Sequence, residues 1–510
     1  MKEVLKQLKK WAEEPDRIAA IERGEIKMTF TELERSSEAL GAYFLDKLQP
    51  GEPVAIWGDK ENAAIVAITA AVKTSHPYAF LPDYYPEQKI EAVTEAAKPA
   101  LIVCVSSMPF PQDRQGVITR DAYEKILEEY DGRTVPESAW PEGDTPVCYV
   151  FTSGSTGTPK GVIISAGCIL ATIPPRLEQI DLLPERIRLT NMTPYAFSMS
   201  ILNLFIYLLY LGSTLYSIEK PLLSDFPTLL KRIIQADAHV MGGTPAFVDI
   251  CMKSEAFSQK SIPSVKLFGM GGEVMTSELA RRLQKRFPDA LISGGFGASE
   301  TTAAGMSIIY TEEILNNNVL LPTGIPHKGT EAYLIDSDGK PVKPGEPGEL
   351  VIVSDYVALG YLNAPEKEAE VFFMKDGKRG YRTRDMMREE NGVFYYLGRA
   401  DNMIKIGGNR IEAEEIERTL MLDDNVKACA VVPAVYEDGK VESIVAHIVP
   451  TKMPEKKIGE VIRLRKWVGE HLPPYAVPRK IVFDETLPRN SNNKIDRQKL
   501  KELEAAILNG

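Results

Sequence analysis

Short apolar runs alternate with longer amphipathic segments along much of the chain. Strands are predicted at 53–58 (PVAIWG), 100–105 (ALIVCV) and 239–247 (HVMGGTPAF), because each is a short apolar run next to turn residues. Helices are predicted at 61–74 and 248–254, directly after two of these strands. Alternation of this kind predicts parallel or mixed sheets with helical crossovers, which is an α/β architecture.

The pattern changes after about residue 320. Turn-rich stretches such as DSDGKPVKPGEPGE separate short strands there, so a β-rich subdomain is predicted to follow the α/β body. After GRAD (398–401) comes a tail with its own apolar strands at 427–435 and 442–450. This tail is long enough for a small separate domain, and its pattern is βααβ-like.

Size and charge limit the classes of protein and partner. A chain of 510 residues is too long for one hydrophobic core and is expected to divide into subdomains. With 44% hydrophobic and 26% charged residues, the composition is typical of a soluble globular protein. The net charge of −11 argues against nucleic acid or an anionic membrane as the main partner, because an acidic surface repels both.

Two segments and the cysteines bear on localisation. The N-terminal stretch MKEVLKQLKKWAEE predicts an amphipathic, mixed-charge helix, so export is not expected. The most apolar run, at 201–212, is shorter than the roughly 20 residues that cross a bilayer, and we expect a buried helix. Five widely spaced cysteines without a CxxC pair predict reduced thiols, no zinc site and a cytoplasmic protein. They are Cys104, Cys148, Cys168, Cys251 and Cys429.

A loop rich in small residues and hydroxyls lies within 149–165, YVFTSGSTGTPKGVIIS. Small residues let backbone amides approach a polyphosphate, serine and threonine add donors, and Lys160 adds a charge, which predicts an anion-binding loop. It is not a Walker A loop, because Pro159 and Gly161 stand where that motif needs glycine and a hydroxyl. An ordinary surface loop is the alternative, but it does not explain Pro159 followed by Lys160.

This loop resembles the signature phosphate loop of the adenylate-forming (AMP-binding) superfamily, which includes carrier-protein adenylation domains, acyl-CoA synthetases and firefly luciferase. Further family-like motifs follow in the family's order and span nearly the whole chain. Within the family, the chain is most similar to D-alanine:carrier protein ligases, as in 73–93 and 473–483. The ordered motifs are LFGMGGEVMT (267–276), GGFGASETT (294–302), 348–372, YRTRD (381–385), 397–417 and LPRNSNNKIDRQKL (487–500).

The resemblance implies a domain organisation and a reaction. Residues 1–398 would form an N-terminal adenylation domain of two α/β subdomains and a small β subdomain, which binds ATP and the acid. Residues 399–402 would be a hinge, and 403–510 a mobile α+β C-terminal domain that carries the catalytic lysine. The implied reaction activates a small carboxylic acid with ATP and Mg²⁺ as an acyl-adenylate, with release of pyrophosphate. The acyl group then passes to the phosphopantetheine thiol of a carrier protein.

The chemistry explains which residues such a site needs. A carboxylic acid with a pKa of about 4 is already ionised at pH 7, so no general base is required. An anion must instead approach an anionic phosphate, and the site must supply cations. By resemblance, Lys494 is the catalytic cation, Glu300 the Mg²⁺ ligand and Asp401 the hinge. The alternative for Lys494 is a solvated lysine in a terminal turn.

The resemblance also assigns the remaining site residues. Phe296 would lie against adenine where the family commonly has tyrosine, and Asp385 would accept hydrogen bonds from both ribose hydroxyls, unless it only caps a turn. Gly407 and Gly408 would border the tunnel for the thiol, unless they form a simple hairpin turn. The nucleotide-binding set is Thr152, Ser153, Gly154, Ser155, Thr156, Lys160, Gly272, Glu273, Phe296, Gly297, Ser299, Asp385 and Arg399. The substrate pocket is Phe197, Ser198, Gly243, Gly271 and Gly295.

The sequence departs from the family at the acid pocket. Ser198 stands where amino-acid-activating relatives carry the aspartate that binds the α-ammonium, and Gly271 stands where D-alanine enzymes tend to carry cysteine. A buried ammonium without a counter-charge binds poorly, although Asn203 or a backbone carbonyl could compensate. The acid is therefore D-alanine or another small amino acid, or else an aryl, short aliphatic or β-amino acid loaded on a carrier or CoA.

A different class of function also stays open, a catalytically silent module that binds a nucleotide. Such a protein has no reason to keep a charge-stabilising lysine, so Lys494, Glu300 and Asp385 argue against it.

Overall fold

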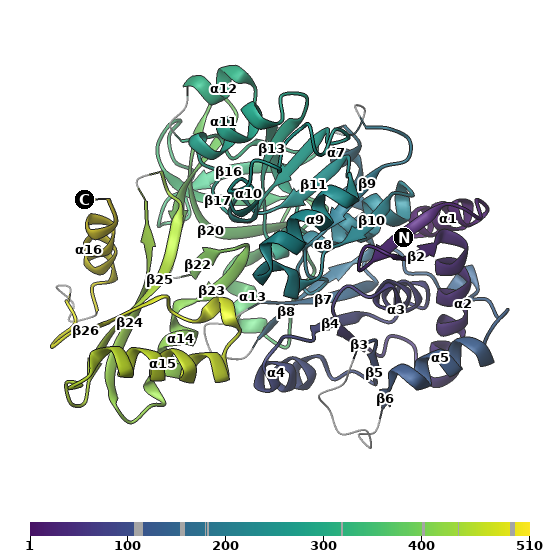
Figure 1. Cartoon of the computed structure of the whole chain (residues 1–510), viewed down its shortest axis with the longest axis horizontal. Coiled ribbons are helices and arrows are strands. Elements are labelled where there is room, and N and C mark those ends of the chain that lie inside the picture. The colour runs from purple at the N-terminus through teal and green to yellow at the C-terminus, as the bar shows by residue number, and fades with distance from the viewer. Residues whose placement is uncertain are drawn as a thin grey trace.

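The computed structural model describes residues 1–106, 116–152, 159–178, 180, 183–317, 320–399, 403–436, 438–489 and 495–509. Most of the chain forms one large body, and the C-terminal elements lie to one side of it (Figure 1). The predicted α/β fold with a small β subdomain and a small C-terminal domain is confirmed. Within the described residues, no helix is both long enough and apolar enough to cross a bilayer.

The first α/β sheet has the strand order β18-β8-β7-β4-β3-β5-β6. The predicted strands and the helix between them are confirmed as β3 (Val54–Gly58), α3 (Asn62–Lys73) and β5 (Leu101–Cys104). Strand β3 runs parallel to both of its neighbours, because α3 and α4 return the chain to the same end of the sheet. The other elements of this part are β4 (Tyr78–Pro82), α4 (Glu87–Ala97), β6 (Val117–Ile118), α5 (Arg120–Glu129), η1 (Glu137–Ala139), β7 (Pro146–Thr152), β8 (Lys160–Ser165), α6 (Ala166–Ala171), α7 (Ile173–Leu177) and β18 (Gly360–Leu362).

The second α/β sheet has the order β15-β14-β13-β12-β11-β9-β10-β1-β2. Its central strands β9 to β13 are parallel, so their carboxyl ends meet at one edge of the sheet. The strands are β1 (Ile18–Glu22), β2 (Ile26–Thr29), β9 (Arg188–Asn191), β10 (Thr214–Ser217), β11 (Val240–Gly243), β12 (Leu267–Met270), β13 (Leu291–Gly297), β14 (Gly305–Ile309) and β15 (Ile325–Pro326). The helices are α1 (Lys2–Ala12), α2 (Phe30–Lys47), α8 (Met199–Ile201), η2 (Leu202–Tyr210), η3 (Lys220–Ser224), α9 (Phe226–Ala236), α10 (Pro245–Cys251), α11 (Ser277–Arg286), η4 (Ser299–Thr301) and α12 (Glu312–Asn317).

One strand of this sheet is shorter than the sequence pattern predicts. The strand expected at 239–247 ends at Gly243, and helix α10 begins at Pro245. Thr244 caps this helix, since its hydroxyl accepts a hydrogen bond from the backbone N–H of Phe247 at 3.3 Å. Proline suits the first turn of a helix because its missing N–H would have no partner there. The prediction was therefore wrong from Thr244 onward.

The apolar run at 201–212 is a buried helix, as predicted. It forms α8 and the π-helical segment η2, and every residue from Leu202 to Leu209 is buried. The five cysteines are also buried, and all are free thiols.

The β subdomain is a five-stranded antiparallel sheet in which β20 and β21 carry Asp385 and Arg399 of the predicted site. Strand β20 is long and holds Asp385 in its middle, between its neighbours β17 and β21. The elements are β16 (Glu331–Ile335), β17 (Gly348–Val353), α13 (Pro365–Val371), β19 (Phe372–Lys375), β20 (Lys378–Glu390) and β21 (Val393–Arg399).

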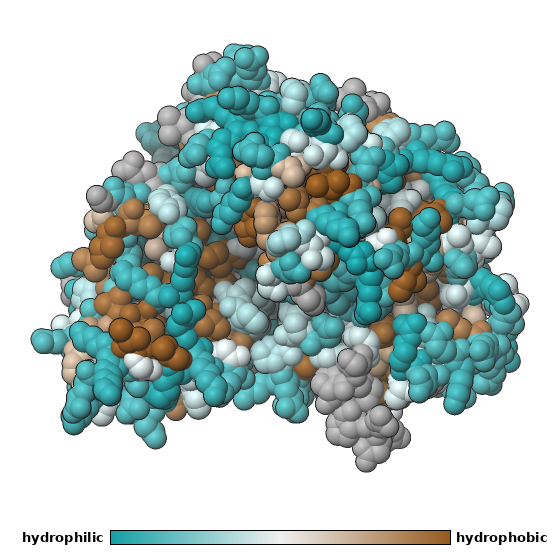
Figure 2. Space-filling model, viewed as in Figure 1, coloured by the Kyte–Doolittle hydropathy of each residue, from teal (hydrophilic) through white to brown (hydrophobic). Residues whose placement is uncertain are grey.

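The C-terminal elements have a hydrophobic core of their own, which includes Ile404, Ile416, Val431 and Leu464. The βααβ-like pattern predicted for them was wrong in order, because a hairpin precedes the first helix and two long strands pair directly. Apolar surface is visible over these elements at the left of Figure 2. The elements are β22 (Met403–Ile406), β23 (Asn409–Glu412), α14 (Ala413–Met421), β24 (Val426–Val435), β25 (Val441–Pro450), α15 (Lys457–His471), η5 (Pro474–Ala476), β26 (Lys480–Phe483) and α16 (Arg497–Asn509). The boundaries at 398 and 403 stay predictions, since residues 400–402 lie outside the described part.

Candidate active site

A cavity of about 920 Å³ lies where the large body meets the C-terminal elements. The carboxyl ends of β11, β12 and β13 line it, together with η2, β20, β21 and the hairpin β22–β23. In α/β sheets, ligands bind at the carboxyl ends of the strands. The described part of the predicted site that lines this cavity is Thr152, Phe197, Ser198, Gly271, Gly272, Glu273, Gly295, Phe296, Gly297, Ser299, Asp385, Arg399, Gly407 and Gly408.

Glycines at the strand ends make room in this cavity. A β-carbon built on Gly242 or Gly269 meets no atom within 4 Å, and one on Gly271 lies 3.3 Å from the Met199 methyl group. Of the predicted pocket residues, Gly243 differs in position, because the neighbouring Gly242 lines the cavity and a β-carbon on Gly243 would face Met192 and Phe247. Side chains at these strand ends would reduce the space for an acid.

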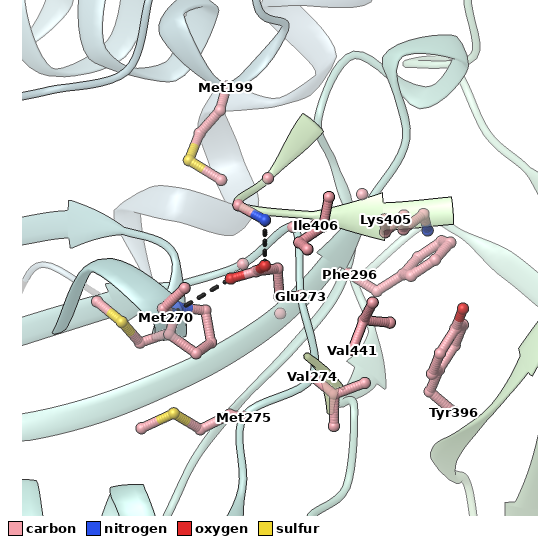
Figure 3. A pocket seen from close by; sticks show the side chains of 18 of the residues that line it. Met199, Met270, Glu273, Val274, Met275, Phe296, Tyr396, Lys405, Ile406 and Val441 are labelled. Carbon is pink, nitrogen blue, oxygen red and sulfur yellow. Dashed lines mark hydrogen bonds between the residues drawn. The ribbon is translucent and has the colours of Figure 1, made fainter. Parts of the chain in front are cut away.

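At one end of the cavity, the Asp385 carboxylate contacts two cationic side chains. Its side chain is 1% exposed, and its carboxylate lies 3.1 Å from a guanidinium nitrogen of Arg399. The ammonium of Lys405 donates to both carboxylate oxygens, at 3.1 and 3.4 Å. Lys405 also lies 5.0 Å from the ring centroid of Phe296 and 5.7 Å from that of Tyr396, as Figure 3 illustrates. Two cations from different parts of the chain therefore converge on one buried carboxylate.

Lys405 was missed in the sequence analysis. The available signal was its place two residues before Gly407 in KIGGNR, since β22 carries Lys405 and leads directly into Gly407, and both residues line the cavity.

The hairpin β22–β23 reaches the cavity with backbone atoms. Gly407 and Gly408 have φ of +58° and +74°, which favour glycine, and the Gly408 α-carbon lies 3.3 Å from a β-carbon built on Gly272. The backbone N–H of Gly407 donates to the Glu273 carboxylate, which also accepts from the N–H of Ala246 at 3.2 Å (Figure 3). Burial raises the pKa of Glu273 above its usual value. Three glycines and one carboxylate thus join the hairpin to the strand ends.

Thr152, one of the predicted phosphate residues, lines the cavity, and Lys160 pairs with it across β7 and β8. Within the described residues, the buried hydroxyl oxygen of Thr152 has no hydrogen-bond partner, which is costly unless a polar ligand binds it. Glu300 is fully buried, and its carboxylate accepts a hydrogen bond from the Tyr361 hydroxyl at 2.7 Å. The Tyr361 ring in turn lies 5.4 Å from the Lys160 ammonium. Lys160 and Glu300 therefore both contact Tyr361.

Several predicted residues lie outside the described part of the chain, and their roles stay predictions. They are Ser153, Gly154, Ser155, Thr156, Asp401 and Lys494.

Comparison with known proteins identifies the family. Residues 8–362 match the family described as AMP-binding enzyme, and residues 415–494 match the AMP-binding enzyme C-terminal domain. The chain belongs to the AMP-binding enzyme family. It is an adenylate-forming ligase that uses ATP, and the predicted resemblance is confirmed.

Relatives of this AMP-binding enzyme include a D-alanine--D-alanyl carrier protein ligase of Bacillus cereus (strain AH187), which is 32% identical over 501 residues and 98% of each chain. A Vibrio cholerae adenylation domain in complex with glycyl-adenosine-5'-phosphate has a TM-score of 0.82 at 22% identity, over 99% of this chain and 97% of the other. A double mutant of the o-succinylbenzoate CoA synthetase of Bacillus subtilis has a TM-score of 0.80 at 21% identity, over 97% and 98%. At such identity the two structures show the shared fold alone.

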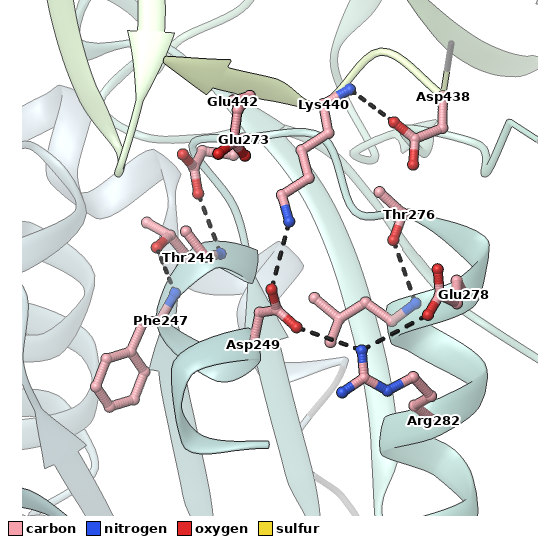
Figure 4. Close-up of polar contacts among 12 residues, drawn as sticks. Thr244, Phe247, Asp249, Glu273, Thr276, Glu278, Arg282, Asp438, Lys440 and Glu442 are labelled. Atoms are coloured by element: carbon pink, nitrogen blue, oxygen red, sulfur yellow. Dashed lines mark hydrogen bonds and ion pairs between the residues drawn. The ribbon is translucent and has the colours of Figure 1, made fainter. Parts of the chain in front are cut away.

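Ion pairs also hold the C-terminal domain of this AMP-binding enzyme against the large body. The Lys440 ammonium donates to Asp249 at 3.3 Å, and Asp249 also accepts from Arg282 at 3.4 Å (Figure 4). A second pair joins Lys89 to Glu415 at 4.0 Å.

Lys440→Met is expected to weaken this domain arrangement only slightly. The Lys440–Asp249 pair is about one-third exposed, at 34% and 30%, and pairs of this kind contribute roughly 0–1 kcal/mol because water screens them. We expect less than about a fivefold change in acyl transfer and an unchanged rate of adenylate formation. Single-turnover assays of the two half-reactions measure both. A larger loss of transfer would mean that Lys440 also binds the acceptor.

Proposed function

We propose that this enzyme activates a small carboxylic acid as an acyl-adenylate, releases pyrophosphate, and transfers the acyl group to the phosphopantetheine thiol of a carrier protein. The observation that carries the proposal is that Asp385 and Phe296 share one cavity with the glycine hairpin of Gly407 and Gly408. Such a cavity can take a nucleotide at one end and a thin thiol arm beside a wall without side chains. The full-length similarity to carrier protein ligases supports the same two-step reaction.

Residues around Asp385 would bind the nucleoside. A carboxylate has about four lone-pair positions, so Asp385 can accept from ribose hydroxyls in addition to the cations that now touch it. Phe296 is nearly buried and offers a flat face for adenine, while Arg399 holds the Asp385 carboxylate in place. Gly272, Glu273, Gly297 and Ser299 would complete the nucleotide-binding wall.

The phosphates would bind at the loop 153–158. Lys160 would supply charge, and the Thr152 hydroxyl would gain the partner it lacks among the described groups. Glu300 fits a Mg²⁺ site, because this ion usually takes one or two carboxylates together with phosphate oxygens and water. Bound Mg²⁺ would lower the repulsion between the phosphates and the incoming carboxylate. Tyr361 would orient Glu300 through its hydroxyl.

Two lysines would act in different steps. In the first step, Lys494 would bridge the acid and the α-phosphate and stabilise the charge that develops on the oxygens. In the second step, the C-terminal domain would turn about Asp401, and Lys405 with the glycine hairpin would occupy the cavity in the arrangement described here. One cavity can then serve both reactions.

Two further parts of the proposal concern the acceptor and the compartment. A carrier protein is preferred to CoA, because CoA needs a further site for its phosphorylated adenosine and the 32% identical relatives carry the name of carrier protein ligases. Five buried free thiols and the use of ATP support work in the cytoplasm.

The relatives make D-alanine, or another small amino acid, the first candidate for the acid. A specific observation favours a second candidate, an acid without an α-ammonium. Ser198 offers only a hydroxyl, which accepts from the Ser299 hydroxyl at 3.2 Å. Each carboxylate of the described cavity wall already contacts a cation or backbone amides. Asp249 contacts Lys440, Glu273 contacts Gly407 and Ala246, Asp385 contacts Arg399 and Lys405, and Glu442 contacts Arg479.

The proposed function is tested by ATP-dependent hydroxamate formation with D-alanine, L-amino acids, β-amino acids, aryl acids and short aliphatic acids. We expect signal with at least one acid and none with Lys494→Ala. The acid that reacts is then offered to a phosphopantetheinylated carrier protein and to CoA, and we expect the carrier to be acylated faster. ATP binding without turnover of any acid would instead favour a silent nucleotide-binding module.

Ser198→Asp is expected to raise kcat/KM for D-alanine by about tenfold or more. The new carboxylate supplies the counter-charge for the α-ammonium, and a charge-assisted hydrogen bond contributes roughly 1.5–3 kcal/mol. It can still accept from Ser299, so the local packing is kept. Pyrophosphate exchange measures the change, with Ser198→Asn as the neutral control. An unchanged value would mean that the ammonium is bound elsewhere in the pocket.

A further inference from the structure

Lys60 is a buried lysine just after strand β3 of the first sheet. It is 2% exposed. Its ammonium donates a hydrogen bond to the backbone carbonyl of Thr193 and lies 4.4 Å from the ring centroid of Tyr195. Both contacts are with the loop 192–198, which joins β9 to α8 in the part of the chain that forms the second sheet. A charged side chain of one sheet therefore holds a loop of the other.

The loop 192–198 ends in the predicted acid pocket. Its last two residues, Phe197 and Ser198, line the cavity. The loop contains no helix or strand, so its shape depends on contacts with its surroundings. The Ser200 hydroxyl donates to the carbonyl of Phe197 at 2.7 Å and so holds the end of the loop. Lys60 holds its beginning.

Tyr195 connects Lys60 to a second part of the pocket wall. Its ring packs edge-on against Phe80 of β4, with 5.3 Å between the ring centroids. The Asn191 side-chain amide donates to the Tyr195 hydroxyl at 2.9 Å and accepts from the Asn203 amide at 3.3 Å. Asn203 belongs to η2 and lines the cavity. Consecutive contacts thus lead from Lys60 to both sides of the acid pocket.

The charge of Lys60 depends on pH near neutrality. Burial lowers the pKa of Lys60 to about 8, whereas Asp59 and Glu61 act to raise it and Lys220 acts to lower it. The facing Tyr195 phenol is neutral, because burial raises its pKa. Lys60 is therefore mostly an ammonium at pH 7 and mostly a neutral amine above about pH 9. A neutral amine donates a weaker hydrogen bond and loses its electrostatic attraction to the Tyr195 ring.

We propose that Lys60 is a positioning residue for the acid pocket, because its ammonium holds the loop 192–198 in the shape that places Phe197 and Ser198 against the acid. Lys60 acts through the loop, since it is not among the residues that line the described cavity. This inference rests on the proposed function, because it concerns binding of the acid in the same adenylation reaction. The nucleotide is proposed to bind beside Asp385, so its binding should not depend on Lys60.

Lys60→Met removes the charge and keeps a side chain of similar length. Pyrophosphate exchange is measured at pH 7 with the acid that gives the strongest hydroxamate signal. We expect KM for this acid to rise about tenfold, as for the loss of one charge-assisted hydrogen bond, while KM for ATP stays within about twofold. Lys220→Met is the matched control, because Lys220 is a neighbouring lysine whose ammonium lies 4.2 Å from the Tyr84 ring. This control is expected to keep the wild-type KM at pH 7.

The pH profile supplies a readout that a merely structural role would not change. In the wild-type enzyme, KM for the acid is expected to rise between about pH 7 and pH 9, as Lys60 loses its proton. Lys60→Met should lack this step, whereas any titration of the acid itself appears in both enzymes. Lys220→Met should move the step to higher pH, because the charge of Lys220 lowers the pKa of Lys60.

Stability is expected to change in the opposite direction. The pKa of Lys60 is about 8 in the folded enzyme and 10.5 in the ordinary, exposed state. Between these values the unfolded chain binds more protons, so the free energy of unfolding rises with pH. Relative to Lys60→Met, the wild-type Tm should therefore rise from pH 7 to pH 9 while acid binding weakens. A relative fall in Tm over this range would overturn the inference.

The outcomes separate this inference from the proposed function. An unchanged KM for the acid in Lys60→Met, or equal rises in KM for the acid and for ATP, overturn the role of Lys60 and leave the adenylation reaction standing. If Lys60→Met does not fold, the profiles of the wild type and Lys220→Met still decide, and the absence of a shift between them overturns the inference. Failure of the wild-type enzyme to react with any acid overturns the proposed function as well.

Discussion

Gly408→Leu is expected to lower acyl transfer to the carrier thiol by about a hundredfold, while adenylate formation stays within about twofold of the wild-type rate. A β-carbon at this position would lie 2.8 Å from the Thr244 methyl group, and φ of +74° is unfavourable for leucine. The hairpin would move away from Gly272 and close the passage for the thiol arm. Adenylate formation uses another domain arrangement in our proposal and does not need this contact.

The measurement separates the two half-reactions in single turnovers. Pyrophosphate release reports the first, and acylation of the carrier by preformed acyl-adenylate reports the second. Gly392→Leu is the matched control, because Gly392 has φ of +80° but no atom within 4 Å of a β-carbon. Equal losses in both half-reactions of Gly408→Leu would contradict the assignment of the hairpin to the second step.

Lys494→Ala is expected to show the opposite pattern, with adenylate formation reduced by about 10²–10³-fold. The lysine ammonium offsets the negative charge that gathers between the acid and the α-phosphate, and alanine leaves that charge unbalanced. ATP affinity should change by less than about threefold, because Lys160, Arg399 and Asp385 remain. Transfer from preformed acyl-adenylate should also remain.

Isothermal titration with ATP and a pyrophosphate-release assay test this pattern. Lys499→Ala is a suitable control, since this lysine lies on the nearby helix α16 without a role in the proposed site. A normal rate of adenylate formation in Lys494→Ala would contradict the proposed mechanism, whatever the result for Gly408→Leu.

Much of the fold is predictable because local patterns decide it. The strand at 53–58 and the helix that follows it have the period and boundaries that the sequence shows. The strand at 239–247 was predicted too long, because its apolar residues continue into a helix that only the cap at Thr244 separates. The C-terminal order was wrong because pairing of β24 with β25 is a long strand–strand contact that periodicity does not specify.

The residues of the candidate site were also only partly predictable from the sequence. Asp385, Phe296 and Gly408 each belong to a short sequence motif that neighbouring residues make recognisable, and all three line one cavity. Lys405 lies within a motif, but its pairing with Asp385 depends on how the two domains meet.

The shared carboxylate of Asp385 has a thermodynamic consequence. Lys405 of the C-terminal domain and the nucleotide proposed to bind beside Phe296 both interact with this one group. Their binding free energies are therefore coupled, and the coupling is reciprocal. A nucleotide that strengthens the hold of Asp385 on Lys405 favours the present arrangement, and the arrangement strengthens the nucleotide's binding by the same factor. In the proposed reaction, loss of AMP after transfer would then bias the domains toward the next cycle.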